Sequence, residues 1–266
     1  MTSQPVPAVP AATLLLLRDT PHGLEVFMVV RNRSIGFASG ALVFPGGKVD
    51  AQDSDLAASD LAEGFPALAP FEAACRIAAL REAYEEAGIL LAHRASDGAL
   101  ISGSELDALS DNRAPIASGA LPFADFLRNH DLRLAADRAV PIARWVTPPE
   151  SPKRFDTLFY VAAAPADQLA AHDGGESVHS VWIRPDQAIA EGEAGKWLII
   201  VPTRFSLEWL AQYRTVDEAM AAARTRTVAP IFGRVEVRDG IEMFCVDEAA
   251  GYPRCAIPTA QLNRGF

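Results

Sequence analysis

A cluster of three glutamates at the end of a predicted helix constrains this chain more than any other feature. The helix is predicted to begin near Phe71, because apolar residues recur at helical spacing from there onward. Glu82, Glu85 and Glu86 stand at positions i, i+3 and i+4, so their carboxylates are neighbours on one helical face. Gly88 follows as the residue expected to adopt a left-handed conformation and end the helix.

Placing three carboxylates there opposes the stability of the helix. Like charges at these spacings cost about 0.2–0.5 kcal/mol per pair, and anions in the last turn face the negative end of the helix dipole. A solvated acidic face is the ordinary interpretation of such a pattern. A divalent cation bound by oxygen ligands would offset the repulsion, and Mg²⁺ is the natural candidate because it leaves positions for water and substrate phosphates.

A second informative stretch lies upstream and reads Phe-Pro-Gly-Gly-Lys-Val-Asp from Phe44 to Asp50. The apolar run that begins at Ala41 ends in Gly46 and Gly47. This pattern is typical of a strand that runs into a loop whose backbone closely approaches another group. Two adjacent glycines on their own indicate no more than a turn.

Together the two stretches resemble the signature of the Nudix hydrolase family, a Gly-Gly turn followed by Arg-Glu-apolar-x-Glu-Glu-x-Gly-apolar at a helix end. The fixed positions are occupied by Arg81, Glu82, Glu85, Glu86, Gly88 and Ile89. There are two departures from the family pattern. Gly47 and Arg81 are 34 positions apart, which implies an insertion of about 20 residues, and the glutamate expected eight positions before the arginine is Ala73.

The resemblance implies an α/β fold, the Nudix-type α/β/α sandwich with a mixed β-sheet between helices. It also implies hydrolysis of the diphosphate linkage in a nucleoside diphosphate joined to another moiety, with Mg²⁺ or Mn²⁺ as cofactor. The metal ligands would be Glu82, Glu85 and Glu86, with a backbone carbonyl near Gly46. Arg81, Gly47 and Gly88 would be structural, Arg81 as the partner of a signature carboxylate.

Further site residues come from loops and strand ends. In many family members an acid from a loop is the general base, and Glu176, in a glycine-containing loop before a predicted strand, is the candidate here. Arg31, Arg33 and Arg154 are the candidates for binding substrate phosphates, because a guanidinium pairs well with phosphate oxygens. Exposed charges that bound a strand or loop are an equally ordinary explanation for these arginines.

Two segments suggest the substrate class. They resemble the branch of the Nudix family in which an insertion interrupts the signature, and this branch includes peroxisomal coenzyme A diphosphatases. These segments are residues 36–44 and 76–82. Coenzyme A or acyl-coenzyme A is therefore the favoured substrate, although Gly36 stands where the bacterial motif has an arginine. ADP-ribose and dinucleotides are alternatives. The alternative to an enzyme is a Nudix domain that binds nucleotides without catalysis. Such domains often lack the signature glutamates, which are all present here.

Composition excludes several other functions. A net charge of −10 argues against general nucleic-acid binding, which needs a basic surface. No apolar run approaches the roughly 18 residues of a membrane span, and the first residues do not resemble a signal peptide. Three separated cysteines suggest neither a disulfide framework nor a zinc site. We therefore expect a cytoplasmic enzyme that acts on a small-molecule substrate and does not bind nucleic acid or membranes. A homodimer is a possible assembly.

The rest of the pattern predicts one Nudix domain. Residues 1–12 are expected to form a mobile tail and residues 13–266 a single domain, with an insertion at about 50–70 and an extension from about 211. Predicted strands are 13–18, 25–31, 142–146, 155–162, 178–183, 234–238 and 242–246. Predicted helices after the signature include 104–109, 123–129, 185–191 and one that begins at Pro202, with a short helix at 55–63 in the insertion.

Overall fold

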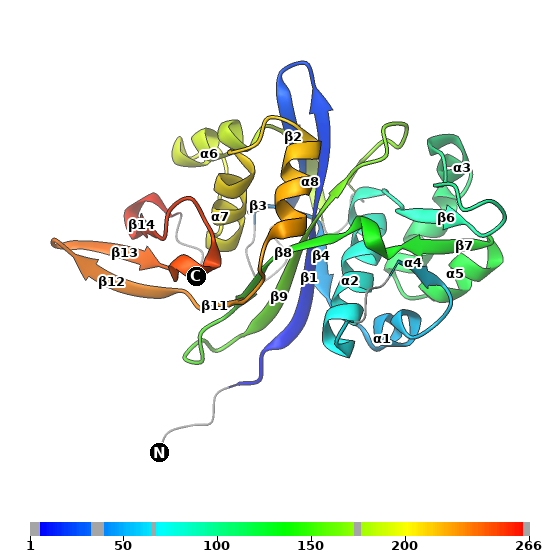
Figure 1. The fold of residues 1–266 in the computed structure, drawn as a ribbon, viewed down its shortest axis with the longest axis horizontal. Coiled ribbons are helices and arrows are strands. Elements are labelled where there is room, and N and C mark those ends of the chain that lie inside the picture. The colour runs from blue at the N-terminus through cyan, green and yellow to red at the C-terminus, as the bar shows by residue number, and fades with distance from the viewer. Residues whose placement is uncertain (1–5, 33–39, 65–67, 173–176, 263–266) are drawn as a thin grey trace.

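A central mixed sheet organises the molecule, and helices cover both of its faces (Figure 1). The computed structural model describes residues 6–32, 40–64, 68–172 and 177–262. The strands follow the order β10-β2-β1-β9-β8-β11, with β3 beside β2 and β4 beside β1. Their bounds are β1 Val9–Thr20, β2 Gly23–Arg31, β3 Leu42–Val43, β4 Gly46–Lys48, β8 Val140–Val146, β9 Phe155–Ala163, β10 Ser177–Ile183 and β11 Pro230–Ile231. The β1–β9 and β8–β11 pairs are parallel, and the other pairs are antiparallel.

β1 lies in the middle of this sheet, and its sequence explains why. Residues 14–17 are four consecutive leucines, as expected of a strand that is covered on both faces. Successive side chains of a strand point to opposite faces. Leu14 and Leu16 accordingly belong to the core cluster shared with the signature helix, whereas Leu15 and Leu17 belong to the cluster on the other face.

The helices form two layers around the sheet. On one side α2 (Pro70–Glu82) contributes Ile77 and Leu80 to the first core cluster. On the other side α7 (Val201–Leu210) and α8 (Val216–Thr225) contribute Phe205 and Ala219 to the second. The helix α6 (Pro185–Glu193) packs beside α7. The predicted sandwich with a mixed sheet is confirmed.

The insertion and the region after the signature build a second, smaller layer beside α2. Its sheet has the order β5-β7-β6, with β5 Ala62–Glu63, β6 Ala92–Arg94 and β7 Leu132–Ala135. The helices of this region are α1 Ala51–Ala57, α3 Gly103–Asp107, α4 Arg113–Ala117 and α5 Phe123–Asn129, with the 3₁₀ turns η2 Ser110–Asn112 and η3 Ala136–Arg138. In Figure 1 this part lies on the right, next to α2.

The C-terminal region forms a third sheet in the order β12-β13-β14 on the opposite side of the molecule. Its strands are β12 Arg234–Arg238, β13 Ile241–Cys245 and β14 Ala256–Pro258, with the 3₁₀ turns η4 Glu248–Ala250 and η5 Thr259–Gln261. The predicted strand pair at 234–246 is therefore confirmed. Among the described residues no helix is long and apolar enough to cross a membrane.

The structure corrects four sequence-based expectations. β1 begins at Val9 rather than residue 13, because Val9–Ala12 pair with β9 and β4. The short helix expected at 55–63 is α1 at Ala51–Ala57, and Ala62–Glu63 form β5 beside β7. The two glycines are not in a loop but in the extended strand β4, paired with β1. α8 was not predicted, although Thr215 and Glu218 form a helix cap there.

Candidate active site

The three glutamates lie where a regular helix changes its winding. α2 ends at Glu82, and Ala83–Ala87 continue as one turn of π-helix, η1, which contains Glu85 and Glu86. Such turns occur mostly as single insertions and frequently at functional sites. Gly88 then ends the helix with φ 69°, the left-handed conformation predicted for it.

Arg81 is the centre of the hydrogen-bond network beneath these carboxylates. Its guanidinium is only 3% exposed and donates from Nε and Nη2 to the two carboxylate oxygens of Asp53, at 2.9 and 3.0 Å. Asp53 is 1% exposed and also accepts the backbone N–H of Asp50 at 2.8 Å. Nη2 donates in addition to the carbonyl of Lys48 at 3.0 Å. This paired, two-bond geometry is the arrangement in which a buried arginine and carboxylate satisfy each other.

The remaining nitrogen of Arg81 joins two of the signature glutamates. Nη1 donates to Glu82 Oε1 at 3.0 Å and to Glu85 Oε1 at 3.1 Å. Arg81 therefore supplies a positive charge to the acidic cluster from within the chain. This guanidinium therefore offsets part of the repulsion between the carboxylates. The clustering of the carboxylates alone does not require a metal ion.

Glu86 is held from the other side by the glycine strand. Its Oε2 accepts the backbone N–H of Gly46 at 2.9 Å, and the Glu86 side chain is buried. A β-carbon at Gly46 would overlap the carbonyl oxygen of Ala12, and one at Gly47 would overlap the carboxylate of Glu82. A β-carbon at Gly46 would thus meet backbone and one at Gly47 the Glu82 side chain, because β4 lies between β1 and the signature carboxylates. This is the close backbone approach that the sequence indicated.

Burial and charge shift the ionisation of this network in opposite directions. Burial raises the pKa of Glu85, and the adjacent Arg81 partly counteracts that effect. Burial also disfavours the charge on Arg81, but the hydrogen bond to Asp53 and the charge of Glu82 outweigh it and raise the pKa of the guanidinium. Arg81 is consequently charged at every pH at which the protein is folded.

The residues fit a divalent cation in chemical type, because Mg²⁺ and Mn²⁺ prefer carboxylate and carbonyl oxygens. Glu82 and Glu85 each bring one oxygen to the same atom, Nη1 of Arg81, so these two oxygens are close together. Glu86 is instead oriented by Gly46. Within the described part of the chain, no group of three or more His, Cys, Asp or Glu side chains converges as a metal site.

The predicted substrate-binding residues occupy different surroundings. Arg31 ends β2, and its buried Nε has no hydrogen-bond partner in the part of the chain that the structure describes. Arg154 is not joined to the signature carboxylates, because its guanidinium donates to the backbone carbonyls of Thr147 and Val6 at 3.0 and 2.7 Å. Arg33 and Glu176 lie outside the described residues.

Asp53 and Arg113 are the site residues that sequence reasoning missed. Arg113 donates from Nε to the carbonyl of Glu85 at 2.9 Å and from Nη2 to the carbonyl of Ala171 at 2.8 Å. Ala171 also donates its N–H to the carbonyl of Ala87 at 2.9 Å. The end of the signature helix is thus fastened to the segment that precedes residues 173–176. Asp53 could have been suspected from Asp50-x-x-Asp53, which is typical of a helix start, whereas nothing local marks Arg113.

Comparisons with known proteins agree with this geometry. The chain matches the family model described as the NUDT19 Nudix domain over residues 58–210, more than half of its length. It is 24% identical to "Acyl-coenzyme A diphosphatase NUDT19" of Xenopus laevis, in an alignment that covers 78% of this chain and 70% of that protein. It is 28% identical to "Putative nudix hydrolase 7" of Caenorhabditis elegans, over 78% of this chain but only 62% of the nematode protein.

A solved structure shares the fold at similar sequence identity. The crystal structure of a Nudix hydrolase from Alicyclobacillus acidocaldarius aligns with a TM-score of 0.67 and 28% identity. The alignment covers 81% of this chain and 96% of the bacterial one. The likeness therefore extends over most of the sheet and helices described above.

Proposed function

This chain belongs to the Nudix hydrolase family, and on that premise we propose that it is a diphosphatase of nucleoside diphosphate derivatives, with coenzyme A or an acyl-coenzyme A as the favoured substrate. The observation that carries the proposal is the position of Glu82, Glu85 and Glu86 at the end of the signature helix, held by Arg81 and by Gly46. The similarity to a protein named acyl-coenzyme A diphosphatase supports the substrate class.

We assign the binding of Mg²⁺ or Mn²⁺ to Glu82, Glu85 and Glu86, with a backbone carbonyl near Gly46 as a further ligand. A divalent cation bound there neutralises phosphate charge and lowers the pKa of a water molecule. The chain itself contributes orientation. Arg81 fixes one oxygen of Glu82 and one of Glu85, and the Gly46 N–H fixes one oxygen of Glu86.

In the proposed reaction a water oxygen forms a bond to one phosphorus and the bridging P–O bond breaks. The water proton passes to a base, and the other phosphate leaves with the bridging oxygen. Glu176 remains our candidate for this base. Its support is that Ala171, five positions earlier in the sequence, is hydrogen-bonded to the end of the signature helix through Ala87 and Arg113. Glu176→Gln is expected to lower turnover while substrate binding is kept.

Arg31 is the substrate-binding candidate with the most support. It is partly buried and stands at the end of β2, two positions before residues 33–39. The terminal nitrogens of its guanidinium would donate to an anionic group of the substrate. Arg33 remains a candidate beside it. Arg154 has less support, because two backbone carbonyls already bind its guanidinium.

Product analysis tests this proposal. The intact protein is incubated with Mg²⁺ or Mn²⁺ and with coenzyme A, acetyl-coenzyme A, ADP-ribose or NADH. Phosphopantetheine and 3′,5′-ADP from coenzyme A are the expected products. AMP from ADP-ribose or NADH instead would keep the reaction and overturn the substrate. Binding of these compounds without turnover under either metal would favour a non-catalytic module.

The domain organisation, the location and assembly of the protein, and its binding partner complete the proposal. Residues 13–266 would act as one Nudix domain, with α1 and β5 as the insertion and the sheet β12-β13-β14 as part of the extension. A cytoplasmic location and a homodimer remain predictions. The partner of the site would be a small nucleotide conjugate rather than nucleic acid.

A further inference from the structure

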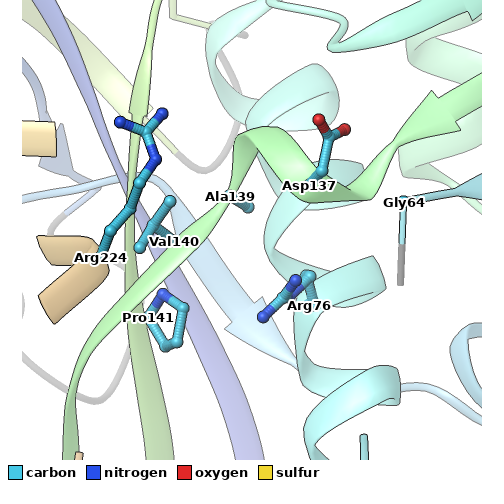
Figure 2. Close-up of a pocket in the computed structure, with 7 residues that line it drawn as sticks. All are labelled: Gly64, Arg76, Asp137, Ala139, Val140, Pro141 and Arg224. Atoms are coloured by element: carbon cyan, nitrogen blue, oxygen red, sulfur yellow. The ribbon is translucent and has the colours of Figure 1, made fainter. Parts of the chain in front are cut away.

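A largely open pocket lies at the beginning of β8, between α2 on one face of the sheet and α8 on the other, and away from the signature carboxylates. It has a volume of about 240 Å³ and is bordered by α2, by η3 with the start of β8, and by the end of α8. Figure 2 shows Arg76 and Arg224 entering its lining from α2 and α8, on either side of β8. Ala139, Val140 and Pro141 give it an apolar wall.

Arg76 is a buried cation with little to bind. Arg76 is only 6% exposed, and its Nε has no hydrogen-bond partner among the residues that the structure describes. Its Nη1 donates to the carbonyl of Ala136 at a long distance of 3.4 Å. The Tyr160 ring lies 5.7 Å from the guanidinium carbon. Leaving a buried charge without an acceptor costs stability, since nothing replaces the lost hydration.

The other two buried arginines show how this chain normally satisfies such a group. Arg81 has both oxygens of Asp53, and Arg204 has Glu208 at 2.7 Å and Glu193 at 2.6 Å. No carboxylate among the described residues forms an ion pair with Arg76. In a chain with ten more acidic than basic side chains, the lack of a counter-ion at this one buried arginine is unexpected.

Arg224 places a second cation at the same cavity. It lies in the last turn of α8 and is exposed. Among the residues that the structure describes, none is paired with its guanidinium. Two arginines that have no carboxylate partner among the described residues thus line one small pocket, on either side of β8, and each offers guanidinium N–H groups to an anion there.

We propose that this cavity binds a small monoanionic carboxylate with a short apolar substituent. The carboxylate would lie between Arg76 and Arg224, and the apolar part against Val140 and Pro141. A doubly charged group is disfavoured because Asp137 also lines the cavity. The volume is below the roughly 300–1,000 Å³ of pockets for drug-sized ligands, so the ligand is small.

This site is separate from the proposed catalytic one. Arg76 precedes Glu82 and Glu86 on the same helical axis by six and ten residues, which corresponds to roughly 9–15 Å. None of the lining residues occupies a fixed position of the signature, although Arg76 begins the segment 76–82 that resembles the coenzyme A branch. The proposal therefore stands or falls independently of the diphosphatase assignment, although a ligand at Arg76 would contact the helix that carries the carboxylates.

Thermal unfolding with sodium propionate tests the proposal, at constant ionic strength maintained with sodium chloride. A ligand that binds only the folded state raises the melting temperature in a saturable manner. We expect such a rise for the intact protein, with an apparent affinity at least about tenfold weaker in Arg76→Met, because charge-assisted hydrogen bonds are lost. Arg138→Met is the matched control, since it removes an exposed charge of η3 that does not line the cavity.

Two further variants keep the test decisive. Arg224→Met changes an exposed residue at little risk to folding and is expected to weaken propionate binding while Arg138→Met does not. Asp137→Asn is expected to strengthen binding, because a like charge is removed. The proposal is overturned if propionate has no saturable effect, if all variants respond equally, or if phosphate binds more tightly than propionate. It is also overturned if Asp137→Asn destabilises the protein, since Asp137 would then be the counter-ion of Arg76.

Discussion

Arg76 and Arg81 lie on one helix, both nearly inaccessible to solvent, yet their surroundings differ completely. Arg81 donates to two carboxylate oxygens of Asp53, to Glu82, to Glu85 and to the Lys48 carbonyl, whereas Arg76 has one long hydrogen bond to Ala136. Burial alone therefore does not distinguish a structural arginine from one that awaits a ligand. The number and geometry of its acceptors do.

The largest expected effect is on stability at Arg81. Arg81→Met leaves the Asp53 carboxylate buried without its cation, so the free energy of unfolding should fall by about 3–5 kcal/mol. Arg76→Met on the same helix should change it by less than about 1 kcal/mol or raise it, because a poorly solvated charge is removed. Urea unfolding of both variants provides the measurement. Equal losses would abolish the distinction between the two arginines.

A comparable loss, but of activity, is expected at Glu86. Glu86→Gln keeps an oxygen to accept the Gly46 N–H but removes the charge proposed to bind the cation. We expect turnover to fall by about 10²–10³-fold, the range seen when one preorganised electrostatic group is lost, with an unchanged unfolding midpoint. Glu72→Gln, an exposed acid in the first turn of α2, is the matched control. Full turnover in Glu86→Gln would contradict the assignment.

A smaller effect distinguishes the two glycines of β4. The β-carbon of Gly46→Ala would overlap the backbone at Ala12, which cannot move away, so we expect a loss of about 1–3 kcal/mol in stability. The β-carbon of Gly47→Ala would meet the Glu82 side chain, which can rotate. Gly47→Ala should therefore lower turnover more than stability. The measurement is a comparison of the unfolding midpoint with kcat for both variants, and the reverse order would show that Glu82 is rigid.

The smallest effect concerns pH. Because burial raises the pKa of Glu85, the carboxyl holds its proton more tightly in the folded state than in the unfolded state. The resulting stabilisation is present below the unfolded-state pKa and is lost as the pH rises through the raised value. In metal-free buffer Glu85→Gln should remove that part of the pH dependence of unfolding. Metal-dependent turnover of the intact protein should rise over the same range, and a flat profile would contradict this.

The sequence allowed the prediction of features that depend on neighbouring residues. The left-handed Gly88, the strand at 25–31 and the helix that begins at Pro185 all follow from local patterns, and the structure confirms them. The cap at Thr215 offered an equally local signal for α8, and it was overlooked. The carboxylates themselves follow from the signature, but their ligand role is still a prediction.

Features that depend on distant contacts could not be predicted. Asp53 is 28 positions from Arg81 in the sequence, and many acids in the insertion would have been equally plausible partners. Arg113 reaches Ala171 across 58 positions. That no carboxylate of the described residues pairs with Arg76 is visible only in three dimensions, because it depends on the positions of side chains far away in the sequence.

The position of β1 also has a consequence for synthesis of the chain. This central strand pairs in parallel with β9, whose residues 155–163 follow it by more than 140 positions. At about 5–20 residues per second, a translating ribosome needs roughly 7–30 s to deliver the second strand after the first. During that interval one edge of an apolar strand, Leu14 to Leu17, lacks its native neighbour. A nascent chain paused before residue 155 should therefore depend on chaperones more than one paused after residue 225.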